Sequence, residues 1–223
     1  MTPAYTYCAL IDVLGYKNRL AEDKDSGEFL FRDDLEQALR AFDEVNSAVF
    51  SVQAISDTIV MTCPAHTNFL EFLDVVRKVF LRFLDRGLFI RGAIAYSRHF
   101  QNNRMTYSHA VARAYELESS VAIYPRIVID ENIVQMHESG TSGVVLKGKG
   151  LILCQNGCYF LSVLDESSWS AAYCSAAKAY ARDKATIFRN EAALSKHVWF
   201  EQYLKDTSVE PGFIPYIERA APY

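Results

Sequence analysis

The chain has 223 residues, half of them hydrophobic, so it is long enough to bury the core of one domain. Its 23 lysines and arginines are outnumbered by 27 aspartates and glutamates, and the formal net charge of −4 disfavours a nucleic-acid polymer as partner. No apolar run reaches the roughly 20 residues of a membrane span, and no basic leader precedes an apolar stretch. We therefore expect a single cytoplasmic domain over 1–223 with no membrane partner, its core over about 5–130 and a C-terminal hairpin and helices over about 131–223.

The cysteines and histidines predict no metal site of their own. The five cysteines are an odd number without a disulfide-dense pattern, so we expect buried free thiols. Cys154 and Cys158 have three residues between them, but no second pair flanks them at zinc-ligand spacing. The histidines are scattered and are expected at solvated or capping positions without a catalytic role: His66, His99, His109, His137 and His197.

Apolar patterning predicts the secondary structure in chain order. Residues 5–12 are apolar and aromatic and stop at an acid just before Gly15, which is typical of a strand that enters a turn. Residues 68–86 carry one broad apolar stripe and predict the most regular helix. The remaining predicted elements are helix 33–44, strands 48–55, 58–63 and 88–96, helix 108–118, strand 126–130, hairpin strands 150–154 and 158–164, and a helix near 170–188 before a Trp- and Tyr-rich tail. This order, β-α-α-β-β-α-β and then a helix, predicts an α+β sheet covered on one face by helices.

Two aspartates carry the clearest chemical signal. Asp12 ends an apolar strand, and Asp57 lies at the tip of the hairpin 48–63. Adjacent central strands would bring the two carboxylates together, and two such acids favour a shared cation. Hard oxygen ligands suit Mg²⁺ or Mn²⁺, which bind through one or two carboxylates plus substrate phosphates. The alternative is structural: Asp12 caps the next helix and Asp57 makes a turn.

Basic residues near these acids predict a phosphate-bearing ligand. The turn from Val13 to Lys17 presents main-chain N–H groups at a helix start, where an anion is favoured, and Lys17 adds a positive charge. Arg91 interrupts an apolar strand, so it needs an anion, either a phosphate or a structural acid. A nucleoside triphosphate with its metal fits this set. Weaker candidate arginines are Arg98, Arg104 and Arg113.

Several motifs resemble those of class III nucleotidyl cyclases. The run Asp12-Val13-Leu14-Gly15-Tyr16 matches their Asp-Ile-x-Gly-Phe motif, and Ser56-Asp57 matches their second metal aspartate at a hairpin tip. Arg91-Gly92-Ala93-Ile94 is similar to their fourth-strand Arg-x-Gly-Ile. The segments ALIDVLGYK, SDTIV, FIRGAIAY, AYELE and YPRIVID, over about residues 5–165, look more specifically like the Pycsar pyrimidine cyclases of bacterial antiphage defence.

The resemblance implies a ferredoxin-like class III cyclase core with a C-terminal hairpin and helical extension. It implies that Asp12, Asp57 and the main-chain carbonyl of Val13 hold two Mg²⁺ or Mn²⁺ ions. Arg91, because of its place inside an apolar strand, is the best candidate for the catalytic arginine. Substrate binding falls to Gly15, Tyr16, Lys17, Gln53 and Tyr115. It also implies a homodimer, in which Asp12 and Asp57 of one subunit face Gln53 and 104–115 of the other, and a cyclic-nucleotide-sensing effector downstream.

Departures from the purine enzymes bear on the base. Residues 108–118 lack their Asn and Arg pair, and Tyr115 lies near the arginine position; Gln53 stands where they carry a lysine. Glutamine can pair with uracil, or with cytosine after an amide flip, although Gln53 can equally be an ordinary strand residue. Tyr96, Tyr107 and Tyr115 are expected near one face, where they would narrow the pocket, although such aromatic residues are more often part of the core. We expect UTP converted to cyclic UMP, with CTP as runner-up; the alternatives are a catalytically silent nucleotide-binding module or another two-metal phosphoryl-transfer enzyme.

Overall fold

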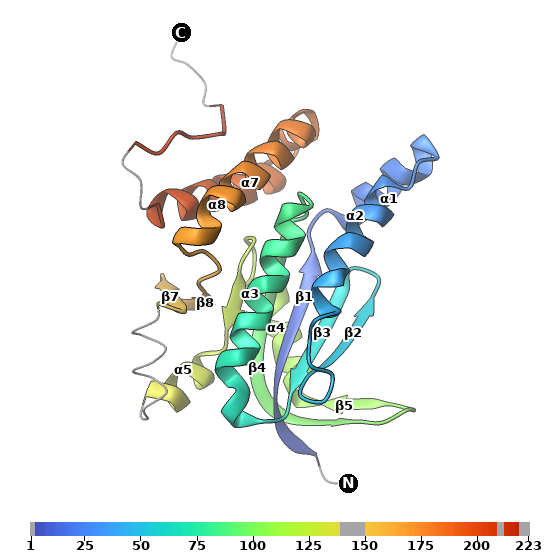
Figure 1. Ribbon diagram of the computed structural model, residues 1–223, viewed down its shortest axis with the longest axis vertical. Helices are drawn as coiled ribbons and strands as arrows, with labels where there is room; N and C mark the ends of the chain where they lie inside the picture. The colour runs from blue at the N-terminus through green and yellow to red at the C-terminus, as the bar shows by residue number, and fades with distance from the viewer. Residues whose placement is uncertain (1–2, 139–149, 209–211, 219–223) are drawn as a thin grey trace.

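The computed structural model describes residues 3–138, 150–208 and 212–218. In this part of the chain one eight-stranded sheet has the order β2-β3-β1-β4-β6-β8-β7, with β5 paired to β4 (Figure 1). The strands are β1 Ala4–Val13, β2 Ser51–Ile55, β3 Thr58–Cys63, β4 Ile90–Gln101, β5 Thr106–Ser108, β6 Ile127–Ile129, β7 Ile152–Gln155 and β8 Cys158–Leu161. The helices are α1 Tyr16–Ser26, α2 Leu30–Leu39, α3 Phe69–Asp85, α4 His109–Ser120, α5 Glu131–Glu138, α7 Glu166–Ile187 and α8 Glu191–Asp206, with 3₁₀ turns η1 Arg40–Phe42 and η2 His66–Asn68.

The first four strands form a ferredoxin-like arrangement. Strand β1 lies between β3 and β4 and is antiparallel to both, while β2 pairs with β3 at the edge. Helices α1 and α2 connect β1 to β2, and α3 connects β3 to β4, so two β-α-β units are interleaved. The predicted α+β class and the order β-α-α-β-β-α-β are confirmed. Strand β6 then extends the sheet parallel to β4.

Helices cover both faces of this sheet, and the expectation of one covered face is wrong. Tyr7, Ala9 and Ile11 of β1 are buried in the main core with the apolar stripe of α3. The alternate residues Cys8 and Leu10 are buried in a second cluster with alanines of α4. Figure 1 shows α3 in front of the sheet and α4 behind it. The helix after β4 crosses to the far face, and periodicity alone does not reveal which face a helix takes.

Glycine 92 permits the close approach of β4 to β1. A Cβ atom at this position would lie 2.4 Å from the carbonyl oxygen of Leu10 and 3.1 Å from the Cα of Ile11. Both obstacles are backbone atoms of β1, so any larger residue would push the two central strands apart. The matched residue pairs of β1 and β4 therefore depend on glycine here.

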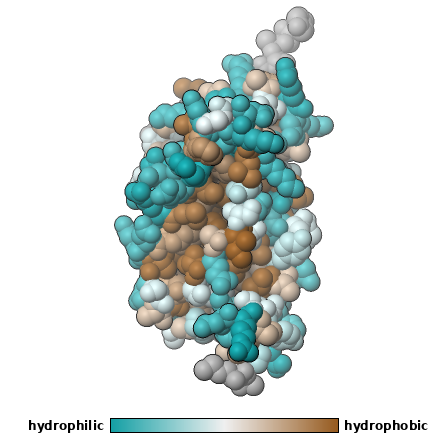
Figure 2. Space-filling view, turned by 90° about the vertical axis from the view of Figure 1, so that its right-hand side faces the viewer, coloured by the Kyte–Doolittle hydropathy of each residue, from teal (hydrophilic) through white to brown (hydrophobic). Residues whose placement is uncertain are grey.

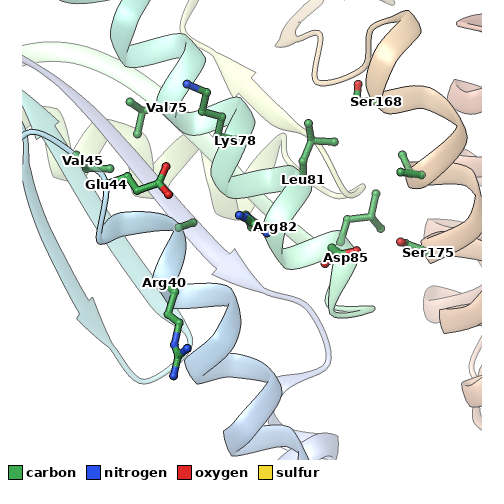
Figure 3. Close-up of a pocket in the computed structure, with 14 residues that line it drawn as sticks. Arg40, Glu44, Val45, Val75, Lys78, Leu81, Arg82, Asp85, Ser168 and Ser175 are labelled. Carbon is green, nitrogen blue, oxygen red and sulfur yellow. The ribbon is translucent and has the colours of Figure 1, made fainter.

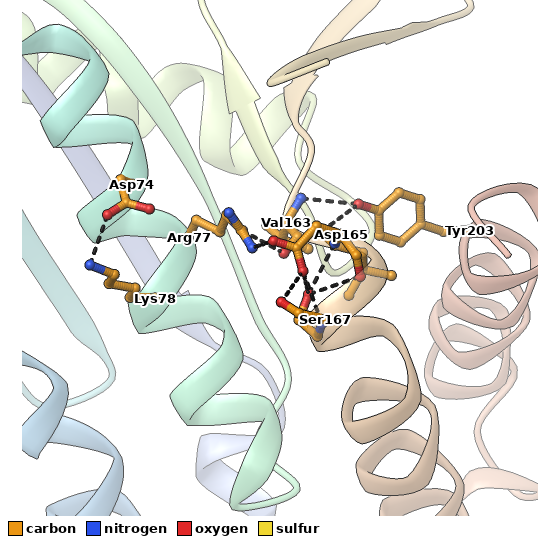
Figure 4. Close-up of polar contacts among 9 residues, drawn as sticks. Asp74, Arg77, Lys78, Val163, Asp165, Ser167 and Tyr203 are labelled. Atoms are coloured by element: carbon orange, nitrogen blue, oxygen red, sulfur yellow. Dashed lines mark hydrogen bonds and ion pairs between the residues drawn. The ribbon is translucent and has the colours of Figure 1, made fainter. Parts of the chain in front are cut away.

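A C-terminal extension of α7 and α8 packs against α3. Figure 4 shows Arg77 of α3 paired with Asp165, while its Nε donates to the carbonyl oxygen of Val163 at 3.1 Å. From α8, the Tyr203 hydroxyl accepts hydrogen bonds from the main-chain N–H groups of Val163, at 3.0 Å, and Leu164, at 3.3 Å. The extension is thus joined to the core by side chains from two helices. The sequence predicted α7 too short, and it predicted only an aromatic tail where α8 lies.

Cysteine and histidine placement differs from expectation at several positions. All five cysteines are free, but Cys154 and Cys174 are exposed rather than buried. His137 and His197 are buried, not solvated. The Tyr7 hydroxyl lies 2.7 Å from Nδ1 of His66 and 2.9 Å from Nε2 of His137. Among the described residues, none of the helices combines the length and apolarity required to cross a membrane.

Asp165 should contribute measurably to stability because it caps the N-terminus of α7 and forms an ion pair with Arg77. Burial acts to raise the pKa of Asp165, but hydrogen bonds from Ser167 and Ser168 and the charge of Arg77 hold that pKa well below its usual range. Asp165→Ala is expected to lower the free energy of unfolding by about 1–2 kcal/mol at pH 7, as loss of a helix cap does. Denaturant titration measures this change.

The matched control is Asp74→Ala, which removes an exposed carboxylate 2.8 Å from Lys78 on the same face (Figure 4). It should change the free energy of unfolding by less than about 0.5 kcal/mol. Because the folded-state pKa of Asp165 is lowered, its contribution is present above about pH 4 and is lost as the pH falls further. Equal effects of the two substitutions would contradict the assignment.

Candidate active site

The end of β1 and the tip of the β2–β3 hairpin meet at one end of the sheet. Asp12 stands opposite Thr58 in β3 and opposite Arg91 in β4. The main-chain N–H of Val13 donates to the carbonyl oxygen of Asp57 at 3.0 Å. Ser56 turns the hairpin with a φ of 59°, in the left-handed region. The strand order thus brings Asp12 and Asp57 together, as the sequence predicts.

Arg91 lies between two carboxylates. Its Nε is 3.2 Å from Oδ2 of Asp12 and 2.7 Å from Oε1 of Glu118, which belongs to α4. Its Nη1 donates to the carbonyl oxygen of Ala122 at 3.4 Å. The sequence left open whether this arginine meets a phosphate or a structural acid. In the structure Arg91 pairs with structural acids. Its guanidinium group therefore orients the Asp12 carboxylate and is not free of ion pairs.

Acids outnumber bases around this point. Burial raises the pKa of Asp12, and the Asp57 charge adds to the rise, while Arg91 and Lys196 oppose it. Burial also raises the pKa of Glu118, and the charges of Asp12 and Asp57 act in the same direction. Three carboxylates therefore share two cations, and the ionised site has an excess negative charge. A bound cation would relieve this repulsion.

The donor set fits a hard divalent cation. Asp12, Asp57 and the adjacent carbonyl oxygens are all oxygen donors, the kind that Mg²⁺ and Mn²⁺ take. Within the described residues no group of three or more acidic, His or Cys side chains is arranged as a complete metal cage. That is compatible with Mg²⁺, which commonly takes one or two carboxylates and completes its shell with water and substrate phosphates.

A cavity of about 300 Å³ opens beside the turn after β1. Gly15 lines it and takes a φ of 80° as the residue before α1, a conformation that favours glycine. The predicted phosphate-binding residues of this turn, Gly15, Tyr16 and Lys17, have different surroundings in the structure. Tyr16 packs edge-on against Phe31 with ring centroids 5.3 Å apart, which is a core contact, and Lys17 is exposed to solvent.

Two charged residues near Asp12 were not among the predicted site residues. Glu118 continues the buried face of α4, four residues after Ala114, and an acid at that position of an apolar stripe is the signal that identifies it. Lys196 of α8 also lines the 300 Å³ cavity and interacts with both Asp12 and Arg91. No local pattern marks Lys196, because it reaches the site only through the packing of the C-terminal extension.

The other predicted residues lie on the α4 side of the sheet or away from it. Gln53 is exposed on the edge strand β2, opposite Val60, and Tyr115 of α4 is 61% exposed. Tyr96 faces the opposite side, where its ring lies 4.4 Å from that of Tyr7, so the expectation that three tyrosines share one face is wrong. Figure 2 shows a hollowed, largely hydrophobic area on the side where β2 lies in Figure 1; Ile55 of β2 is 74% exposed.

The weaker arginine candidates do not reach the acids. Arg98 stands opposite Tyr5, at the other end of β1 from Asp12, and Arg104 is exposed beyond the end of β4. Arg113 pairs with Asp130 at 2.9 Å and with Glu116 at 3.3 Å. Arg91 remains the predicted arginine that the fold brings to Asp12.

A larger cavity, of about 580 Å³, lies elsewhere. It opens between η1, α3 and α7, with Arg40, Arg82 and Asp85 among its lining residues (Figure 3). None of the predicted site residues lines it. Size therefore does not identify the site; the placement of the acids does.

No known family model matches this chain, and no curated protein matches it. Among solved structures, it is similar to the monomeric guanylyl cyclase domain of the RhoGC fusion protein from the aquatic fungus Blastocladiella emersonii, with a TM-score of 0.42, 14% identity and coverage of 72% of this chain and 96% of that one. It is also similar to an adenylate/guanylate cyclase/hydrolase from Silicibacter pomeroyi, with a TM-score of 0.42, 15% identity and coverage of 62% and 82%. Likeness at this level does not assign an activity.

The excess of negative charge predicts how the site responds to cations. Asp12→Asn removes a carboxylate that has raised pKa and two acidic neighbours, so it should increase the free energy of unfolding in metal-free buffer. Saturating Mn²⁺ should stabilise the unsubstituted chain, by about 2.7 kcal/mol at a hundredfold excess over Kd, and should stabilise Asp12→Asn much less. Thermal unfolding with and without Mn²⁺ measures both effects; an equal Mn²⁺ shift in the two proteins would contradict a cation site at Asp12.

Proposed function

We propose that this chain is a nucleotidyl cyclase, which forms a 3′,5′-cyclic nucleotide and pyrophosphate from a nucleoside triphosphate. The observation that supports this most is the convergence of Asp12 and Asp57, from the end of β1 and the tip of the β2–β3 hairpin, beside a cavity. The motif resemblance around Asp12, Asp57 and Arg91 gives the arrangement its chemical interpretation.

The proposed roles follow from position. Asp12, Asp57 and the main-chain carbonyl of Val13 would hold two Mg²⁺ or Mn²⁺ ions. When bound, such ions lower the pKa of the ribose 3′-hydroxyl and neutralise the charge on the departing pyrophosphate. The chain contributes orientation: Glu118 pairs with Arg91, Arg91 pairs with the Asp12 carboxylate, and the turn at Gly15 lines the cavity where phosphates would lie. Catalysis of this kind is mostly positioning, so small displacements of these groups matter.

We extend the proposal to a homodimer whose sites combine two subunits. Gln53 and Ile55 are exposed on β2 and Tyr115 is exposed on α4, and large exposed apolar surface commonly marks an interface. In this arrangement Asp12 and Asp57 of one subunit face Gln53 and 104–115 of the other. The product would act as a messenger for a cyclic-nucleotide-sensing effector in antiviral defence.

The metal acids are tested by substitutions that keep shape. Asp12→Asn and Asp57→Asn should each reduce turnover at least about 10²-fold, as loss of a key electrostatic group does. The assay incubates the protein with Mn²⁺ and a ribonucleoside triphosphate and identifies cyclic product by mass spectrometry. The control Asp74→Asn should retain full activity, since Asp74 pairs with Lys78 on an exposed helix face. Retention of more than about a tenth of the activity in either site variant would refute the assignment.

The dimer is tested by mixing inactive subunits. Light scattering should give about twice the chain mass of 25.3 kDa. If Tyr115 acts across the interface, subunits carrying Asp57→Asn and subunits carrying Tyr115→Ala should regain part of the activity on mixing, because one hybrid site holds neither change. A fully active monomer would rule out shared sites.

The identity of the nucleobase is the most specific part of the proposal. Gln53 offers both a donor and an acceptor, and a site that hydrogen-bonds its substrate rejects mismatched bases strongly. In an equal mixture of the four ribonucleoside triphosphates we expect cyclic UMP as the main product, with cyclic CMP second. Gln53→Ala should lower this preference. Cyclic AMP or cyclic GMP as the main product would overturn the pyrimidine assignment and leave the cyclase assignment in place.

A further inference from the structure

We propose that Lys196 of α8 binds the phosphates of the nucleoside triphosphate, and that the C-terminal extension is therefore a wall of the active site. This inference rests on the proposed function and assigns a substrate-binding role to a segment outside the ferredoxin-like core. It is carried by a cavity, by the charges around that cavity and by the way α7 and α8 are fastened to it.

The cavity lies between the ferredoxin-like core and the C-terminal extension. Its volume is about 300 Å³, and the core contributes Leu14, Gly15 and Phe89 to its lining. The extension contributes Lys196 from α8 and Asp183 from α7. Leu14 and Gly15 directly follow the strand that carries Asp12, and Lys196, on the opposite wall, interacts electrostatically with Asp12. Asp12 and Asp57 do not themselves line the cavity.

Lys196 is the cation available to that ligand. Arg19, the other base in the lining, has its Nη2 2.6 Å from Asp183, so its charge is already compensated. Lys196 is half-buried and forms no ion pair within the described part of the chain. Burial lowers its pKa, and repulsion from Arg91 acts in the same direction, against an attraction to Asp12. Bringing phosphate oxygens to its ammonium group would relieve this cost.

The helix that carries Lys196 is held in place because both α7 and α8 contact the segment that precedes β4. Nη2 of Arg182 in α7 donates to the carbonyl oxygen of Gly87 at 3.0 Å, just before β4. The Phe89 ring packs edge-on against His197 at 4.8 Å and Phe200 at 5.1 Å. Burial lowers the pKa of His197 to about 4, so the residue beside Lys196 is neutral at pH 7. The lysine is thus presented by a helix that is held against the core.

The test uses inorganic tripolyphosphate with Mg²⁺ as the probe, because it carries the phosphates without a base or ribose. Binding to the full chain is measured by calorimetry. Lys196→Met keeps most of the aliphatic stem and should weaken tripolyphosphate binding about tenfold or more, while Lys196→Arg should restore most of it. Lys205→Met, an exposed lysine on the same helix outside the cavity, should bind as the unsubstituted chain does.

Steady-state kinetics provides a second measurement. Lys196→Met should raise KM for the nucleoside triphosphate with a smaller change in kcat, and its thermal unfolding midpoint should match that of Lys205→Met. Unchanged tripolyphosphate affinity and unchanged KM in Lys196→Met, in a chain that turns over substrate, would overturn this inference and leave the proposed function standing. A chain that neither binds tripolyphosphate nor forms a cyclic product would instead overturn the proposed function.

Discussion

The register of β1 between β3 and β4 is the constraint on which the rest of the site depends. In antiparallel strands, opposite residues share a face, so Asp12 must point to the same side as Thr58 and Arg91. A slip of one residue in the strand register would move the Asp12 side chain to the other face of the sheet, where the main apolar core lies. Gly92 protects this register because a side chain there would meet the backbone of β1. The chemistry of the site thus follows from strand pairing more than from any local motif.

The second determinant is an imbalance of charge that the fold maintains. Asp12, Asp57 and Glu118 interact with one another, and Arg91 and Lys196 are the bases that act on them. A structural ion-pair network would be expected to balance its charges, because uncompensated buried charge is destabilising. The cation of the proposed function would offset this cost, and perturbed charges of this kind cluster at functional sites. Arg91 has a positioning role in this arrangement, since it holds two carboxylates at once.

Much of this fold follows from the sequence for clear physical reasons. Two short strands separated only by Ser56-Asp57 leave no alternative to a hairpin, and the broad stripe of α3 requires a sheet to pack against. The meeting of Asp12 and Asp57 then follows from strand order. The side of the sheet is harder: Tyr96 and Tyr115 lie on different faces because strand phase and helix crossing are set by tertiary packing. The place of Lys196 could not be predicted from the sequence, because it depends on how α8 packs over residues more than a hundred positions earlier.

The cavity wall made by α7 and α8 has a consequence for biosynthesis. Asp12, Asp57, Arg91 and Glu118 all precede α7 and α8 in the sequence, so they emerge from the ribosome earlier and their strands can pair early. The wall that carries Lys196 is translated only after all of these residues. A chain synthesised only as far as the central strands would therefore carry the acids without this wall of the cavity. Under the proposed function, such a chain would lack the lysine proposed to bind phosphate.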